Sequence, residues 1–129
     1  MSERYAALKK LSDEFLGVFN RADIDGIMSS FAEDVVYEEF YGKVSDGKAA
    51  IRRSFENLFS DRFGTIRLDE DDTFIDADAG KVMSSWHLHL EMDGRPVALA
   101  GLDLLYFDGS RITRKLTYVQ ARAGLYEPA

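Results

Sequence analysis

The chain has 129 residues, of which 46% are hydrophobic and 12% aromatic, and its formal net charge is −7. This composition is typical of a single globular domain with a core of its own. The excess of acidic residues argues against a nucleic-acid partner, because phosphates are neutralised by Lys and Arg. The absence of Cys excludes disulfides, thiolate zinc sites and cysteine nucleophiles. We expect a cytoplasmic protein with no membrane partner, since no signal-like segment and no apolar run of roughly 20 residues is present.

Helical periodicity dominates the first half of the chain. Apolar residues at helical spacing predict helices over 2–20, 23–31 and 46–63, with Ser2, Asp23 and Asp46 as their N-terminal caps. Between the second and third helices, β-branched and aromatic residues predict a short strand over 34–40, followed by a loop over 42–47.

Residues after Gly64 alternate as β-strands do. We predict strands over 65–76, 81–92, 96–107 and 111–120. Asp-Gly pairs at 93–94 and 108–109 are typical of tight hairpin turns, so the last three strands form an antiparallel meander. The acidic run 69–72 interrupts the first of these strands and is expected to form a solvated bend. The sequence therefore predicts one α+β domain over residues 1–129, with three N-terminal helices packed on a mainly antiparallel sheet.

Asp103 is the most conspicuous polar residue, because it lies in the apolar stretch 97–105. Strand alternation places Asp103 on the same face as Leu99 and Gly101. If that face is interior, burial should raise the pKa of Asp103 and keep it protonated as a hydrogen-bond donor. The alternatives are that Asp103 pairs with an Arg or Lys, or that a partner subunit covers this face.

Other charged residues leave two interpretations open. Alternation directs one of Glu38 and Glu39 inward, unless both are surface acids on an edge strand. His87 and His89 share one face of their strand, opposite Trp86. Either they contact a ligand and one acts as a base assisted by Asp103, or they lie on the outer or subunit-facing side of the sheet. No spacing motif predicts a metal site.

One of the neighbouring residues Arg114 and Lys115 must face inward if their strand is regular. The inward residue would then be a candidate cation for binding an acidic ligand inside the pocket.

Four segments resemble the nuclear-transport-factor-2-like superfamily, which includes SnoaL-like polyketide cyclases and ketosteroid isomerases. They are 20–27 (NRADIDGI), 31–35 (FAEDV), 47–52 (GKAAIR) and 105–112 (LYFDGSRI). The resemblance runs from about Leu8 to Gln120. It implies that the sheet is strongly curved around the helices to form a cone, and that a pocket opens at one end.

The resemblance to ketosteroid isomerases implies catalytic roles for Glu39, at the position of the carboxylate base, and for Asp103, at the position of the hydrogen-bonding acid. Phe15 stands at the position of the family's tyrosine and has no hydroxyl, which Tyr37, Tyr41 or Tyr118 could supply instead.

In SnoaL-like cyclases the last strand often ends in an acidic residue, and Gln120 stands at that position here. Epoxide hydrolases of the superfamily need an Arg where this chain has Gly101. Neither signature is complete in this sequence.

These considerations predict a pocket for a small apolar or carbonyl-containing ligand. The predicted ligand-binding residues are Phe15, Tyr37, Leu99, Gly101, Tyr118 and Gln120. The predicted activity is proton transfer by an isomerase, cyclase or dehydratase-like enzyme without a cofactor. The alternative is a non-catalytic ligand-binding or dimerisation module, which the missing hydroxyl at Phe15 and the neutral Gln120 favour. We also expect a homodimer, with Tyr106, Trp86 and Leu90 as candidates for the apolar outer face of the sheet.

Overall fold

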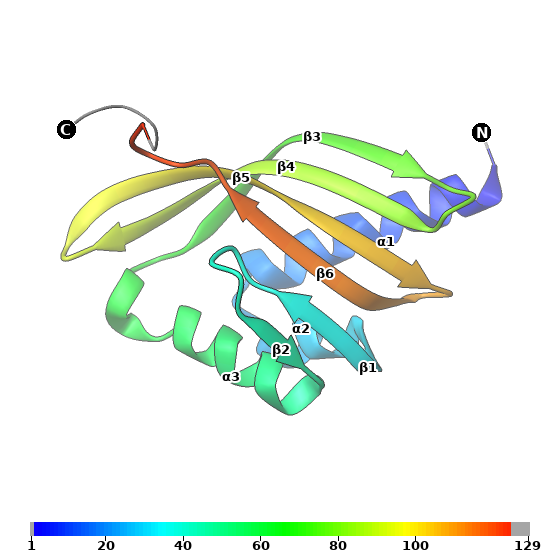
Figure 1. Cartoon of the computed structure of the whole chain (residues 1–129), viewed down its shortest axis with the longest axis horizontal. Coiled ribbons are helices and arrows are strands. Elements are labelled where there is room, and N and C mark those ends of the chain that lie inside the picture. Colours follow the sequence, from blue (N-terminus) through cyan, green and yellow to red (C-terminus); the bar gives the residue numbers. More distant parts are fainter. Residues whose placement is uncertain (1, 125–129) are drawn as a thin grey trace.

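Three α-helices pack on one face of a curved sheet in the computed structural model, which describes residues 2–124 (Figure 1). The elements are α1 (Glu3–Asn20), α2 (Ile24–Ser29), β1 (Phe31–Glu38), β2 (Val44–Asp46), α3 (Lys48–Leu58), the 3₁₀ helix η1 (Asp61–Phe63), β3 (Arg67–Asp76), β4 (Lys81–Met92), β5 (Arg95–Asp108) and β6 (Arg111–Val119). The six strands of this described part follow the order β2-β1-β6-β5-β4-β3. Neighbours are antiparallel except β1 and β6, which are parallel. The predicted α+β class is therefore confirmed.

Two of the three predicted helix caps are confirmed. The Ser2 hydroxyl accepts a hydrogen bond from the Tyr5 N–H at 3.0 Å, and the Asp23 carboxylate accepts one from the Gly26 N–H at 2.9 Å. The prediction of Asp46 as a cap is wrong. Asp46 ends strand β2, and α3 begins after Gly47, whose φ of 84° is easily adopted only by a residue without a side chain.

The region between α2 and α3 differs from the prediction at both ends of its strand. Phe31 does not end the second helix but begins β1, where it is fully buried and pairs with Ile112 of β6. The loop predicted over 42–47 contains the short strand β2, which pairs with the end of β1. Both differences arise because pairing with strands distant in sequence extends the sheet beyond what local propensity indicates.

The acidic run does not end its strand. β3 is continuous through it, and the register with β4 shifts between Glu70 and Asp72, so that Asp71 forms a bulge. The predicted hairpin between β4 and β5 is confirmed, since Asp93 and Gly94 have φ values of 53° and 74°.

Aromatic residues form much of the core between the helices and the sheet. Phe15 of α1 packs edge-on against Phe31, with ring centroids 5.7 Å apart, and Phe55 of α3 lies beside the same ring. At the end of α1, the Asn20 side chain bonds both backbone groups of Leu68 in the edge strand β3, at 2.7 and 2.9 Å. These contacts fix α1 and α3 on the face of the sheet that also carries the candidate site.

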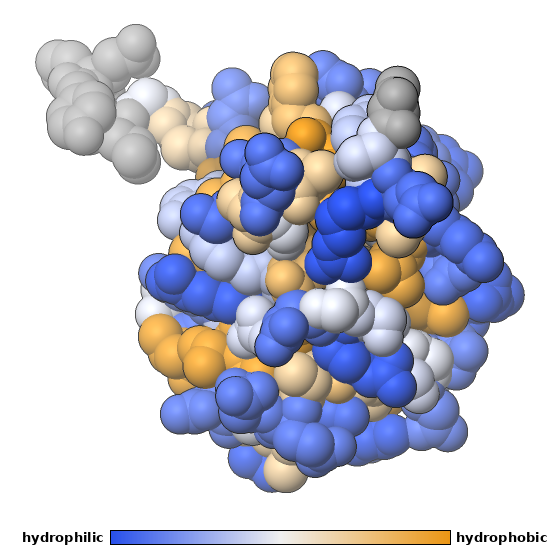
Figure 2. Space-filling view, turned by 90° about the vertical axis from the view of Figure 1, so that its right-hand side faces the viewer, coloured by the Kyte–Doolittle hydropathy of each residue, from blue (hydrophilic) through white to orange (hydrophobic). Residues whose placement is uncertain are grey.

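No helix among the described residues is long and apolar enough to cross a membrane. The end of the molecule seen in Figure 2 is mostly hydrophilic, with smaller hydrophobic areas between the charged side chains.

Candidate functional site

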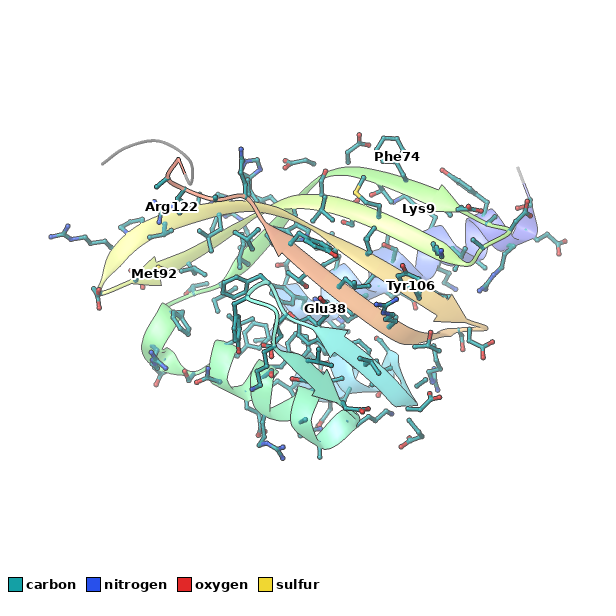
Figure 3. All side chains as sticks on the ribbon, in the orientation of Figure 1. Lys9, Glu38, Phe74, Met92, Tyr106 and Arg122 are labelled. Atoms are coloured by element: carbon teal, nitrogen blue, oxygen red, sulfur yellow. The ribbon has the colours of Figure 1, made fainter. Side chains whose placement is uncertain are left out.

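A cavity of about 350 Å³ lies between the sheet and the helices, within the size range of small-molecule pockets. Its wall is mainly apolar and aromatic, with Phe15 and Phe19 from α1, Phe55 from α3 and Trp86 from β4. Exposed side chains also line the cavity, among them Phe40 and Tyr41 from the turn after β1. Another is Met92 at the β4–β5 hairpin, which Figure 3 shows at the end of the molecule. Two hydrogen-bonded clusters of polar side chains lie among the residues of this wall.

The first cluster joins three strands at the cavity wall. Lys115 of β6 donates from Nζ to Asp103 Oδ1 of β5 at 3.2 Å and to Thr117 Oγ1 at 2.7 Å. The Thr117 hydroxyl lies 2.6 Å from the same Asp103 oxygen and 3.4 Å from the Tyr37 hydroxyl of β1. Lys115 Nζ also lies 4.2 Å from the centroid of the Tyr37 ring. Asp103, Lys115 and Thr117 are all buried, so water competes little for these contacts.

Burial lowers the pKa of Lys115, but Asp103 and Tyr37 outweigh this effect and raise it above the ordinary value of 10.5. Lys115 is therefore an ammonium at neutral pH, and it needs the Asp103 carboxylate as its counter-charge. Asp103 accepts hydrogen bonds from Lys115 and Thr117 in this cluster, whereas the sequence predicted that it would donate them. The alternative, pairing with a Lys, is the arrangement found. The expectation that one of Arg114 and Lys115 faces inward is confirmed for Lys115.

The second cluster surrounds Glu39, just after the end of β1. Its Oε2 accepts hydrogen bonds from the hydroxyls of Ser45 at 3.2 Å and Ser54 at 3.3 Å. Glu39 is partly buried and lines the cavity. Its neighbour Glu38 does not line the cavity and lies 4.0 Å from Arg114, whose side chain is half-exposed. The structure thus separates the two glutamates, which the sequence could not.

Three predicted ligand-binding residues, Phe15, Tyr37 and Leu99, line the cavity. Gly101 is not part of the lining but lies directly against the ring of Trp86, where a Cβ would come within 2.6 Å of a ring carbon. Gly101 therefore makes room for the indole that forms part of the wall.

The placement of Tyr118 and Gln120 in the pocket is wrong. Tyr118 pairs with Leu102, on the opposite face of the sheet from the Asp103–Thr117 pair, and both Tyr118 and Gln120 are exposed. Alternation along β6 instead turns Lys115, Thr117 and Val119 toward the cavity. Thr117 and Val119 can be found in the sequence by taking every second residue after Lys115, once Lys115 is known to face inward.

The histidines lie on the outer face of the sheet. His87 Nδ1 is 2.6 Å from Asp71 and His89 Nε2 is 3.0 Å from Asp69, both on β3. Neither histidine lines the cavity. The pKa of Asp69 is lowered, chiefly by hydrogen bonds from Arg67. Among residues 2–124 no group of three His, Cys, Asp or Glu side chains could hold a metal ion.

Trp86 and Leu90 do not belong to the outer face, contrary to prediction. Both are buried and line the cavity, because β4 presents its even-numbered residues to the helices. The Nε1–H group of Trp86 is buried and has no hydrogen-bond partner within the described part of the chain. Tyr106, the third candidate, does alternate onto the outer face, where Lys81 and Arg114 lie over its ring.

Residues 13–115 match the SnoaL-like domain family. This chain belongs to the SnoaL-like family. No curated protein matches it. Among solved structures, a proposed polyketide cyclase from Xanthomonas campestris pv. campestris is 20% identical over 92% of this chain and 93% of its own, with a TM-score of 0.83.

Two further structures show the range of proteins with this fold. An LEH-like epoxide hydrolase from M. tuberculosis is 17% identical, covers 90% of this chain and 84% of its own, and has a TM-score of 0.76. A protein with a ketosteroid isomerase-like fold from Catenulispora acidiphila, in complex with trimethylamine, is 15% identical. It covers 84% of this chain and 83% of its own, with a TM-score of 0.75. At these identities the similarities establish the nuclear-transport-factor-2-like fold of the SnoaL-like chain and not its activity.

Proposed function

We propose that this SnoaL-like protein binds a small, largely apolar carbonyl compound and catalyses proton transfer beside the carbonyl, as an isomerase or cyclase that needs no cofactor. The observation that carries the proposal is that Glu39 and Asp103 line one mainly apolar cavity. A carboxylate in such surroundings can act as a general base toward an acidic C–H bond.

Glu39 is the proposed base. Both of its side-chain hydrogen bonds, from Ser45 and Ser54, fall on Oε2. They hold the carboxylate in one orientation and leave Oε1 to take the proton. Asp103 has a different role, because it accepts hydrogen bonds from Lys115 and Thr117 and so positions these groups at the cavity wall.

The alternative is a binding module of the same fold without catalysis. It is favoured by Phe15, which offers no hydroxyl to a ligand, and by Gln120, which is exposed and outside the cavity. The two functions differ in one measurable property, because only the enzyme exchanges carbon-bound protons of its ligand with water.

The test uses 2-tetralone, an apolar bicyclic ketone with acidic protons next to its carbonyl. Binding is measured by calorimetry and deuterium uptake from D₂O by NMR. We expect the protein to accelerate uptake and Glu39→Gln to reduce the acceleration by about 10²–10⁴-fold, the usual contribution of a general base.

Glu38→Gln is the matched control, because it removes the neighbouring carboxylate, which lies outside the cavity beside Arg114. It should exchange at the wild-type rate. Tetralone that binds without accelerated exchange would contradict the enzyme and support the binding module.

A further inference from the structure

Part of the cavity lining is open to solvent. We call it the exposed lining, and its described residues are Phe40, Tyr41, Asn57, Arg62 and Met92. Phe40 and Tyr41 are 60% and 61% exposed, and Met92 is 40% exposed. A ligand confined to the buried part of the cavity would leave these three side chains in water, whereas a longer ligand would cover them and gain from their burial. The exposed lining therefore favours a ligand that extends from the cavity towards solvent.

The exposed lining is carried by elements that contact one another. The hydrogen bond from Ser54 to Glu39 joins α3 to the turn after β1. The 3₁₀ helix η1, which carries Arg62, packs against β4, which ends at Met92. Figure 1 shows the end of α3 and η1 on the same side of the molecule as the β4–β5 hairpin. These contacts hold Arg62 beside the end of β4, where a ligand that extends from the cavity can reach it.

Charge differs between the buried and the exposed parts of the lining. The charged residues of the lining are Glu39, Asp103, Lys115 and Arg62. Lys115 is paired with Asp103, whereas Arg62 forms no ion pair with a carboxylate among residues 2–124. A carboxylate placed inside the cavity would lose its hydration and be repelled by Glu39. At Arg62 the same carboxylate meets an unpaired cation and keeps part of its contact with water.

An aromatic ring holds the guanidinium of Arg62. Its central carbon lies 5.1 Å from the centroid of the Phe63 ring, which also lines the cavity and packs against the core. A guanidinium attracted to a ring in this way keeps N–H donors for hydrogen bonds, and their planar arrangement matches the two oxygens of a carboxylate. The side-chain amide of Asn57 provides further donors in the exposed lining. This part of the lining is therefore suited to a carboxylate.

We infer that Arg62 binds a carboxylate at the end of the ligand remote from the reacting carbonyl, so that the cavity selects apolar ring ketones bearing a carboxylic acid on a side chain. This inference rests on the proposed function, because it specifies the substrate class of the same cavity. The ring occupies the buried part of the cavity, and the side chain passes along the exposed lining to Arg62. Arg62 determines specificity in this arrangement and takes no part in proton transfer.

The test compares a carboxylic acid with a neutral amide of nearly the same shape. The probes are 4-(2-naphthyl)butanoic acid and 4-(2-naphthyl)butanamide, and their affinities are measured by calorimetry at pH 7 and low salt. We expect the wild-type protein to bind the acid about tenfold more tightly, because hydrogen bonds between charged groups are stronger than those to a neutral amide. Arg62→Gln should remove most of this preference. Arg62→Lys should keep only part of it, because an ammonium lacks the planar pair of donors that matches a carboxylate.

Arg53→Gln is the matched control, because Arg53 is an exposed arginine of α3 that does not line the cavity. Both changes remove one positive charge, so a general effect of net charge would lower the preference equally in the two variants. We expect Arg53→Gln to keep the wild-type ratio of affinities. An equal loss in both variants, or a preference for the acid that survives Arg62→Gln, would overturn the inference.

Failure of the acid site and failure of the base are distinguishable. The 2-tetralone probe has no carboxylate, so its exchange depends on Glu39 and should be unchanged in Arg62→Gln. Glu39→Gln should lose this exchange and still bind the acid more tightly than the amide. Accelerated exchange by a wild-type protein that binds the two naphthyl probes equally would support the enzyme and overturn the acid site. A preference for the acid that depends on Arg62, without any exchange, would contradict the enzyme and support the acid site.

Discussion

At the scale of single residues, the ion pair between Lys115 and Asp103 dominates the chemistry of the cavity. Removing one member leaves an uncompensated buried charge, which typically costs about 3–5 kcal/mol, whereas removing both is often nearly neutral. We therefore expect Lys115→Met to lower the free energy of unfolding by about that amount. Asp103→Asn/Lys115→Met should recover most of it, as measured by urea denaturation. A double variant as unstable as the single one would contradict the pairing.

The same pair predicts a dependence of stability on alkaline pH. The pKa of Lys115 is raised in the folded protein despite burial, because Asp103 and Tyr37 favour the ammonium, whereas an unfolded lysine titrates near its ordinary value of 10.5. A lysine whose pKa is higher in the folded protein than in the unfolded chain stabilises the fold fully at pH values below its unfolded pKa. This stabilisation is lost as the pH rises through its folded pKa. We expect the unfolding free energy to fall above about pH 10.5 more steeply than in the double variant. A parallel decline in both proteins would show that other groups cause it.

How far the site could be predicted also depends on individual residues. Asp103 could be recognised because a carboxyl group within 97–105 contrasts with its apolar neighbours. Its partner could not, because alternation requires one of Arg114 and Lys115 to face inward without deciding which. Tyr118 and Gln120 were misplaced for the same reason, since the register of β6 against β5 follows from pairing and not from local pattern.

At the scale of elements, the long helices and hairpins were predictable and the short connections were not. Ser2 and Asp23 cap their helices as expected, and the Asp93-Gly94 turn determines the β4–β5 hairpin. Strand β2 has only three residues, so its pairing with β1 has little local sequence signal. The bulge at Asp71 also has little sequence signal, because its acidic neighbours indicate solvent exposure and do not indicate that the strand continues through them.

The junction between α1 and the edge strand β3 gives a prediction at this scale. Asn20→Ala removes two hydrogen bonds to the backbone of Leu68, each worth about 0.5–1.5 kcal/mol. We expect a loss of about 1–3 kcal/mol in unfolding free energy, with faster amide exchange in β3. Lys10→Ala, an exposed change elsewhere on α1, should leave both quantities nearly unchanged. Unaltered exchange in β3 after Asn20→Ala would contradict the role of this junction.

At the scale of the whole molecule, the outer face of the sheet carries an apolar row across four strands. Phe74 pairs with Met83, Met83 with Leu104, and Leu104 with Leu116. Phe74 lies on the side of the sheet away from the helices (Figure 3) and is 62% exposed, and Tyr118 on the same face is 50% exposed. Leu116 is buried and Met83 and Leu104 are partly buried, so Phe74 and Tyr118 are the exposed apolar side chains of this face, and such residues often mark interaction sites. We propose that a second copy of the chain covers this row.

Sedimentation at micromolar concentration tests the homodimer, which should have the mass of two chains. Phe74→Glu and Tyr118→Glu should each shift the equilibrium toward the monomer, because each places a charge in the apolar contact. Val44→Glu alters an exposed apolar residue on the edge strand β2 and should leave the dimer intact. A wild-type monomer, or a dimer broken only by Val44→Glu, would contradict an interface on the outer face.

The chain contains one tryptophan, and that residue lines the cavity with its N–H group unpaired within the described structure. All indole emission of the protein therefore originates at the site itself. A ligand that accepts a hydrogen bond from the indole or stacks on its ring should change the intensity and wavelength of that emission. Unlabelled protein can thus serve as its own optical sensor in a plate-based screen, in which compounds are ranked before any assay of their conversion exists.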